Sequence, residues 1–155
     1  WPALLDMCRE EGLVNVTFET NGSQLAKPEF IDYFNNDAKD LHVTWSTSPK
    51  LSVSGEPLEK TLKPEVMLSL NEVENSFLYN KFVIRDQECL EEVNMFVESY
   101  KNVGAKIDSV FLMPEGATLE QQALTEKDVA EVCMKTGYKF SPRLHISLFG
   151  NAWGT

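Results

Sequence analysis

Several features that mark particular classes of protein are missing from this sequence. It has neither a Walker loop nor a GxGxxG pattern, so a phosphate-cradling loop has no support. No apolar run approaches the roughly 20 residues needed to span a bilayer, which argues against a membrane protein. His145 has no Ser or Cys nucleophile in an elbow and no Asp placed to orient it, so a hydrolase triad is not indicated.

Basic residues are in the minority. The chain has 24 acidic and 14 basic residues, which gives a formal net charge of -10. That charge opposes non-specific binding to nucleic acid or to anionic lipid. We therefore expect neither nucleic acid nor a membrane as a partner.

Cysteine is also scarce. Cys8, Cys89 and Cys133 are an odd number of widely spaced residues without a CxxC pair, so neither a disulfide framework nor a zinc site is indicated. We expect reduced thiols and a cytoplasmic location. Cys133 is interpreted as a core residue rather than a nucleophile.

An initiator methionine is missing as well. The sequence opens with a short helical pattern, Trp1 to Gly12, that ends in a glycine cap and lacks the features of a signal peptide. We therefore interpret the chain as part of a longer protein. Its 155 residues suit a single domain, residues 1–155, with enough core to need no disulfides.

One sequence pattern occurs four times in the chain. An apolar, β-branched run stops at a small polar turn, and a helix-like stretch follows. The runs are Val14–Phe18, Leu41–Trp45, Lys81–Ile84 and Ser109–Leu112. This alternation predicts an α/β fold with about four parallel strands. Because the carboxyl ends of parallel strands share one edge, four polar turns would converge on one ligand site.

Three of these turns carry groups suited to a polar ligand. Glu19–Gly22 offers backbone N–H groups and a hydroxyl, and Ser46–Lys50 adds three hydroxyls, a rigid proline and a lysine. Met113–Gly116 is a weaker candidate. Each could equally be an ordinary turn or a solvated loop, and the residues alone leave both interpretations open.

The remaining segments have recognisable patterns. A helix is predicted from Asp86, as its cap, to Lys101, and another from Thr125, in a weak capping box with Asp128, to Gly137. A shorter helix is expected at Pro64–Leu70. We expect a loop at Ser52–Lys60, and Leu144–Thr155 alternates like a strand.

The order of these segments resembles 7-carboxy-7-deazaguanine synthase, a radical S-adenosylmethionine enzyme of the queuosine (7-deazapurine) pathway. The resemblance covers nearly the whole chain. It rests on Phe18–Gly22, Ser48–Lys50, Lys81–Ile84, Met113–Pro114, and Arg143–His145 leading to the Gly150–Thr155 terminus. It implies a partial TIM-like (radical SAM) barrel that is incomplete at the amino terminus.

The resemblance also implies roles for individual residues. Thr20 and the terminal Thr155 would contact a pterin substrate, 6-carboxy-5,6,7,8-tetrahydropterin. S-adenosylmethionine would be held by Gly22, Ser48, Pro49, Lys50, Met113, Pro114, Glu115 and Gly116. Met113 stands where the family more usually has glutamine.

By the same resemblance, the complete enzyme uses a [4Fe-4S] cluster, Mg²⁺ and S-adenosylmethionine. A 5′-deoxyadenosyl radical abstracts hydrogen from the pterin, and ring contraction with loss of ammonia gives 7-carboxy-7-deazaguanine. The family's Cys-x3-Cys-x2-Cys loop, its Mg²⁺ threonine and its Gly-Gly-Glu-Pro turn are not in this sequence. We therefore expect the chain alone to be inactive.

Two other functions remain as alternatives. One is a non-catalytic α/β binding module derived from a radical S-adenosylmethionine fold. The other is a different enzyme of that superfamily, such as an activase. The resemblance leaves a homodimer open as the assembly.

Overall fold

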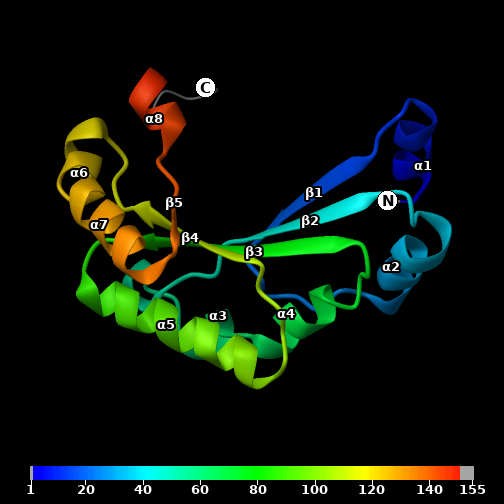
Figure 1. The fold of residues 1–155 in the computed structure, drawn as a ribbon, viewed down its shortest axis with the longest axis horizontal. Coiled ribbons are helices and arrows are strands. Elements are labelled where there is room, and N and C mark those ends of the chain that lie inside the picture. The colour runs from blue at the N-terminus through cyan, green and yellow to red at the C-terminus, as the bar shows by residue number, and fades with distance from the viewer. Residues whose placement is uncertain (1, 151–155) are drawn as a thin grey trace.

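The structure is a computed structural model, which describes residues 2–150, and strands alternate with helices along it (Figure 1). The strands are β1 (Asn15–Thr20), β2 (His42–Thr47), β3 (Ser76–Ile84), β4 (Ser109–Pro114) and β5 (Lys139–Phe140). The helices are α1 (Pro2–Glu10), α2 (Pro28–Asp32), α3 (Leu58–Thr61), α4 (Pro64–Leu70), α5 (Gln87–Asn102), α6 (Leu119–Ala123), α7 (Glu126–Thr136) and α8 (Leu144–Phe149). A π-helical turn at Tyr33–Asp37 extends α2, and a 3-10 turn occupies Ser52–Ser54.

The strands form one parallel sheet in the order β1-β2-β3-β4-β5. The predicted α/β class is confirmed, with a short fifth strand in addition to the four expected. In the described part of the chain β1 and β5 are the two edges, so the sheet is open. An open parallel sheet flanked by helices fits a partial TIM-like barrel.

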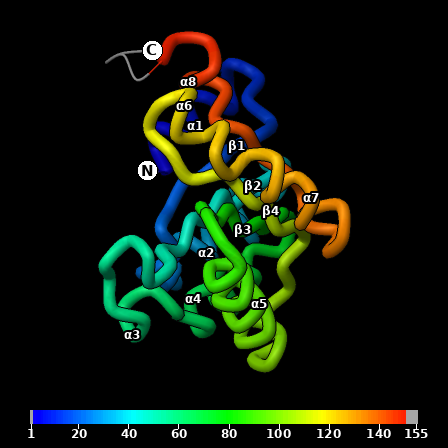
Figure 2. Tube along the Cα trace, turned by 90° about the vertical axis from the view of Figure 1, so that its left-hand side faces the viewer, coloured from blue at the N-terminus to red at the C-terminus, as the bar shows by residue number. Residues whose placement is uncertain are grey.

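The two faces of the sheet have different surroundings. Alternate residues of β3, from Leu78 through Asn80 and Phe82 to Ile84, are buried against helices. The residues that alternate with them, Phe77, Tyr79, Lys81 and Val83, are partly or largely exposed. They lie on what we call the open face. Figures 1 and 2 show α3, α4 and α5 together on one side of the sheet. Because strand side chains alternate with a period of two, the register alone decides which residues reach the open face.

Helix α5 is the main support of the covered face. Its apolar residues recur at helical spacing, and Leu90, Val93, Phe96, Val97 and Tyr100 are all buried. The Asp86 carboxylate caps the helix by accepting a hydrogen bond from the Cys89 amide over 2.9 Å. The predicted cap is therefore confirmed. Within residues 2–150, no helix combines the length and apolar character needed to cross a membrane.

An aromatic cluster packs β1 and β2 against α2. The Phe18 ring stacks on Trp45 with centroids 5.1 Å apart and meets the edges of Phe30 and Phe34 at 5.2 and 6.0 Å. Such offset and edge-on pairs add to the stabilisation that comes from burying apolar area. The cluster fixes β1, and with it the turn that follows Thr20.

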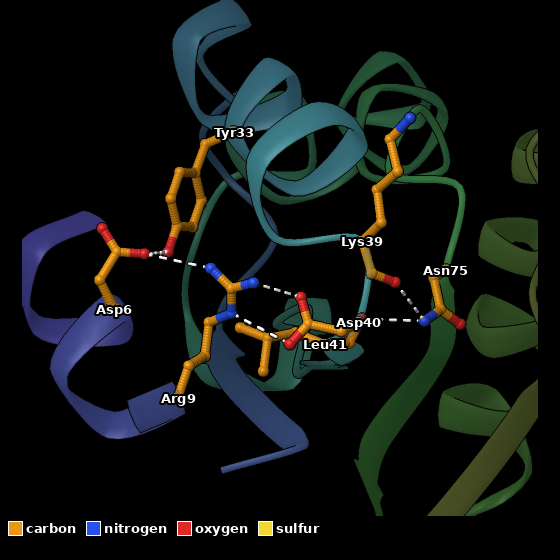
Figure 3. Close-up of polar contacts among 7 residues, drawn as sticks. All are labelled: Asp6, Arg9, Tyr33, Lys39, Asp40, Leu41 and Asn75. Carbon is orange, nitrogen blue, oxygen red and sulfur yellow. Dashed lines mark hydrogen bonds and ion pairs between the residues drawn. The ribbon is translucent and has the colours of Figure 1, made fainter. Parts of the chain in front are cut away.

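Polar contacts attach α1 to the rest of the fold (Figure 3). The Arg9 guanidinium makes a two-pronged contact with the Asp40 carboxylate, with its Nε 3.1 Å from Oδ2. Asp6 accepts a hydrogen bond from the Tyr33 hydroxyl over 2.7 Å and lies 3.2 Å from Arg9 Nη1. The Arg9 side chain also lowers the pKa of the Asp40 carboxyl by hydrogen bonding.

Two predictions about local structure were wrong. Leu144–Phe149 is helix α8 rather than a strand, and of its residues only Ile146 is buried. An alternating pattern becomes a strand only beside another strand, and in the described residues the pairing of β5 with β4 ends at Phe140, before this segment. Thr125 occupies the N-cap position of α7, but its side chain makes no capping hydrogen bond there; its hydroxyl donates to the carbonyls of Glu115 and Gln122.

Other elements begin or end at residues that differ from the prediction. The expected loop at Ser52–Lys60 contains the 3-10 turn and the start of α3. β2 continues to Thr47, so Ser46 and Thr47 lie in the strand rather than in the turn after it. β4 likewise continues through Met113 and Pro114. The predicted helix at Pro64–Leu70 is confirmed, with Pro64 in its first turn.

Candidate functional site

The carboxyl ends of the first four strands lie along one edge of the sheet. The register pairs Thr20 with Thr47 and Ile84 with Pro114, so polar segments follow neighbouring strand ends. After β1 the chain turns sharply, and the Gly22 amide donates to the Thr20 hydroxyl over 3.1 Å. The predicted convergence of the turns on one edge is thus present in the fold.

A small cavity lies over the ends of β1 and β2 and beside Lys81 of β3, and we call it the β1–β3 cavity. Its volume is about 270 Å³, and it is lined by Glu19, Thr20, Asn21, Ser46, Ser48, Lys50 and Lys81. Every one of these side chains is polar. Two ammonium groups face one carboxylate here, so the cavity carries positive charge in a protein with a net charge of -10.

Neighbouring residues of β2 face opposite sides of the sheet. The Thr47 hydroxyl lies on the covered face, where it donates to the Tyr79 carbonyl over 3.0 Å and accepts a hydrogen bond from the Asn80 amide. Ser46 instead lines the β1–β3 cavity. It is 2% exposed, and its hydroxyl has no hydrogen-bond partner among the described residues.

Ser48, Pro49 and Lys50 form the turn after β2. The Ser48 hydroxyl donates to the Lys81 carbonyl over 3.1 Å, which ties this turn to β3. Pro49 is buried and Lys50 is exposed. Two of the three predicted cofactor contacts, Ser48 and Lys50, therefore line the cavity, and Pro49 supports them from within the fold.

Gly22 lies beneath the turn rather than in the wall of this cavity. Its φ of +70° is in the left-handed region, and it is buried. A Cβ atom at this position would lie 2.6 Å from Cε of Met67 and 3.9 Å from Cγ of Pro49. Packing against Met67 is therefore one reason that this position needs glycine.

A second cavity, of about 690 Å³, lies over the ends of β3 and β4. Glu115 and Gly116 line it, together with Arg85, Asp86 and Arg143 among others. We call it the β3–β4 cavity. The Cys89 amide and the Arg85 side chain both bond to the Asp86 carboxylate, which lowers the pKa of Asp86.

Arg143 closes one side of the β3–β4 cavity. Its Nε–H points at the Met113 sulfur over 3.2 Å, and Nη1 donates to the Gly116 carbonyl over 3.1 Å. Gly116 has a φ of +141°, and a Cβ atom there would come within 2.7 Å of the Gln122 backbone nitrogen. Met113 and Pro114 lie within β4, and Pro114 is buried.

The predicted residues are thus divided between two cavities along one edge. Thr20, Ser48 and Lys50 belong to the first, and Glu115 and Gly116 to the second. Thr155 lies outside the described residues. A larger groove of about 920 Å³ lies between α2 and α4, away from these strand ends.

Several residues that line these cavities had no role assigned from the sequence: Lys81 and Arg143 lie outside the three predicted polar turns, and Glu19 and Ser46 lie within them. A signal existed for Lys81, because a lysine within the apolar strand Ser76–Ile84 indicates a side chain on an uncovered face. Ser46 could not be placed without the register, since a shift of one residue would turn it to the covered face.

The cysteines do not form a metal site. Within residues 2–150, no group of three or more His, Cys, Asp or Glu side chains is arranged to hold a metal ion. Cys89 and Cys133 are buried, and burial raises the pKa of both thiols. The interpretation of Cys133 as a core residue is confirmed.

Comparison with curated proteins gives three relatives, each named 7-carboxy-7-deazaguanine synthase. The protein from Pyrobaculum aerophilum is 29% identical over 150 residues, which is 95% of this chain. Those from Halobacterium salinarum and Rhodopirellula baltica are 33% and 31% identical, each over 75 residues. The resemblance to 7-carboxy-7-deazaguanine synthase is confirmed. No family model and no solved structure matches the chain.

The chain spans only part of these synthases. The alignment covers 58% of the Pyrobaculum aerophilum protein, and 29% and 28% of the other two. In this chain the two shorter alignments cover 46% and 48%.

Proposed function

We propose that this chain is part of a 7-carboxy-7-deazaguanine synthase, and that its strand-end edge holds S-adenosylmethionine and 6-carboxy-5,6,7,8-tetrahydropterin. The proposed product is 7-carboxy-7-deazaguanine, formed with loss of ammonia. The observation that carries the proposal is the similarity over 95% of the chain to a protein of that name. The polar edge formed by the strand ends is compatible with it.

The residues fit a nucleoside cofactor that carries an amino acid. The β1–β3 cavity offers hydroxyls, a carboxylate and two ammonium groups within one polar pocket. We assign Ser48 and Lys50 to S-adenosylmethionine, with Gly22 and Pro49 shaping the turn beneath them. Bound S-adenosylmethionine supplies the radical chemistry, and the protein supplies position and hydrogen bonds.

The second cavity extends the proposed cofactor site. Met113, Pro114, Glu115 and Gly116 follow the same edge, where Gly116 lets backbone come close and Arg143 orders the segment. Thr20 is assigned to the pterin, as is Thr155, which lies outside the described residues. Among the described residues, no group of three or more His, Cys, Asp or Glu is arranged to hold a metal ion, and we assign neither the iron–sulfur cluster nor Mg²⁺ to them.

The proposal extends to partners and location. We propose a small-molecule pterin as the partner, with neither nucleic acid nor a membrane involved, in the cytoplasm. The acidic charge of the chain supports the first exclusion. A homodimer stays a prediction, to be checked by light scattering.

The test uses the complete protein that contains this chain, purified anaerobically. It is incubated with S-adenosylmethionine, a reductant and 6-carboxy-5,6,7,8-tetrahydropterin, and the product is identified by mass spectrometry. We expect 7-carboxy-7-deazaguanine, with S-adenosylmethionine regenerated rather than consumed. Absence of this product from a folded, cofactor-loaded protein that binds both compounds would favour the binding-module alternative.

Two variants test the assigned roles. Thr20→Val and deletion of Thr155 should each cost more free energy of pterin binding than free energy of unfolding. Lys139→Met is the control, because this exposed side chain bonds to Ser109 and lines neither strand-end cavity. Unchanged pterin affinity in both variants would remove Thr20 and Thr155 from the substrate site.

A further inference from the structure

The Ser46 hydroxyl is the first of two unsatisfied groups in the β1–β3 cavity. The side chain is 2% exposed, and its Oγ has no hydrogen-bond partner among the described residues. Buried hydroxyls in folded proteins are almost always hydrogen-bonded, so one without a partner requires an explanation. Ser46 lines the cavity, and a ligand in the cavity would supply the missing partner.

The second group is the Lys81 ammonium. The side chain is 27% exposed, and its nearest acidic partner is Glu19, with Nζ 3.9 Å from Oε1. That distance is well beyond the roughly 2.7–2.9 Å of a charge-assisted hydrogen bond. The Glu19 side chain is 76% exposed and can turn to solvent. Lys81 therefore keeps most of its capacity to bind an anion.

The fold holds these two groups side by side on the open face. Ser46 pairs laterally with Glu19 of β1 and with Tyr79 of β3, and Lys81 is the next residue of β3 on the same face as Tyr79. The bond from the Ser48 hydroxyl to the Lys81 carbonyl holds β3 against the end of β2. The hydroxyl and the ammonium thus line one cavity from rigid strands rather than from mobile loops.

We propose that Lys81 and Ser46 form a carboxylate-binding subsite in the β1–β3 cavity. The ammonium supplies the charge and the Ser46 hydroxyl supplies a directed hydrogen bond, while Glu19 is placed to accept from an amino group next to the carboxylate. This inference rests on the proposed function. Both proposed ligands carry a carboxylate, the methionyl group of S-adenosylmethionine and the 6-carboxyl of the pterin, and the shared chemistry is what the subsite recognises.

The experiment measures equilibrium binding to the complete protein by isothermal titration calorimetry under anaerobic conditions. One arm compares S-adenosylhomocysteine with 5′-methylthioadenosine, which lacks the amino acid portion. The other compares 6-carboxypterin with pterin. Each ligand is titrated into wild type, Lys81→Met and Ser46→Ala. Lys139→Met, which removes a positive charge from the open face outside the cavity, is the control.

We expect Lys81→Met to weaken binding of the carboxylated member of one pair at least about tenfold, while the other member of that pair is unaffected. The pair that responds identifies the source of the carboxylate. Ser46→Ala should give a smaller loss in the same arm, because a neutral donor contributes less than a charged one. Lys139→Met should behave like wild type in both arms.

Other outcomes contradict the inference in distinguishable ways. In one outcome wild type binds both ligands of a pair, while Lys81→Met binds them with unchanged affinity or with affinity lowered equally for the two. In either case the subsite is wrong and the proposed function stands. If wild type binds none of the four compounds, the proposed function fails and the subsite fails with it. Unfolding midpoints of the variants, measured beside the titrations, separate lost contacts from lost structure.

Discussion

Replacing Gly22 with alanine tests why the turn after β1 needs glycine. The backbone at Gly22 has a φ of +70°, and an alanine forced into that region costs about 1–2 kcal/mol. The added Cβ would also lie 2.6 Å from Cε of Met67, the far end of a flexible side chain that is 0% exposed and would have to shift within the core. Overpacking of this kind costs a further 1–3 kcal/mol, roughly. Gly22→Ala should therefore lower the free energy of unfolding by about 2–5 kcal/mol.

A double mutant separates the two contributions. Met67→Ala alone should cost about 2–5 kcal/mol through the cavity that it leaves. In that background the clash with Cε is gone, so Gly22→Ala should cost only the backbone part, about 1–2 kcal/mol. The difference between the two costs is the coupling energy, obtained from urea denaturation of the four proteins followed by circular dichroism.

Gly12 is the matched control for this prediction. Its φ is +91°, but a Cβ there would meet no atom within 4 Å. Gly12→Ala should therefore cost only the backbone part, about 1–2 kcal/mol. The reasoning is refuted if Gly22→Ala costs no more than Gly12→Ala, or if its cost is the same with and without Met67. A confirmed coupling would mean that lost ligand binding in Gly22 variants does not by itself show contact with a cofactor.

Three further predictions concern stability and metal content. Asp86→Ala should lower the free energy of unfolding by about 1 kcal/mol at pH 7, with Asp86→Asn close to wild type. Because the pKa of Asp86 is lowered in the fold, the stabilisation from its carboxylate is present above the unfolded pKa and is lost as the pH falls through the folded pKa. The difference in free energy of unfolding between wild type and Asp86→Ala should therefore narrow in acid, and a constant difference would contradict this. Arg9→Met should speed amide exchange in α1 and leave α5 unchanged, since Arg9 ties α1 to Asp40; equal exchange in both proteins would show that this contact is not needed. Residues 1–155 alone, reconstituted with iron and sulfide, should show no stable [4Fe-4S] spectrum and no activity, and such a spectrum would overturn the expectation.

The parts of the fold that were predictable depend on local signals. Helix α5 has a cap at Asp86, apolar residues at helical spacing and a glycine after its end, so neighbouring residues determine it. The four longer strands are β-branched runs that end at polar turns. The family resemblance added the roles proposed for Thr20, Ser48 and Lys50 at the carboxyl ends of these strands.

The failures come where the presence or absence of a distant partner, rather than the local pattern, decides the structure. Leu144–Phe149 alternates like a strand, yet it forms α8 because no strand lies beside it to complete a ladder. Thr125 has the residue type of a cap, but its φ of -120° and ψ of -17° differ from the extended backbone typical of an N-cap, and its hydroxyl donates to the Glu115 carbonyl. Neither outcome can be read from the residues near the segment.

The sequence by itself determined the alternation of strands and helices, the polar strand ends and their likeness to a family of synthases, because all three depend on the order of residue types. Only the tertiary structure decided which side chains share a cavity. Register turns Ser46 toward the open face and Thr47 away from it, and it brings Lys81 beside Ser46 from a strand about thirty-five residues later. The physical reason is that the pairing of strands, rather than the composition of any one strand, sets which face each side chain occupies.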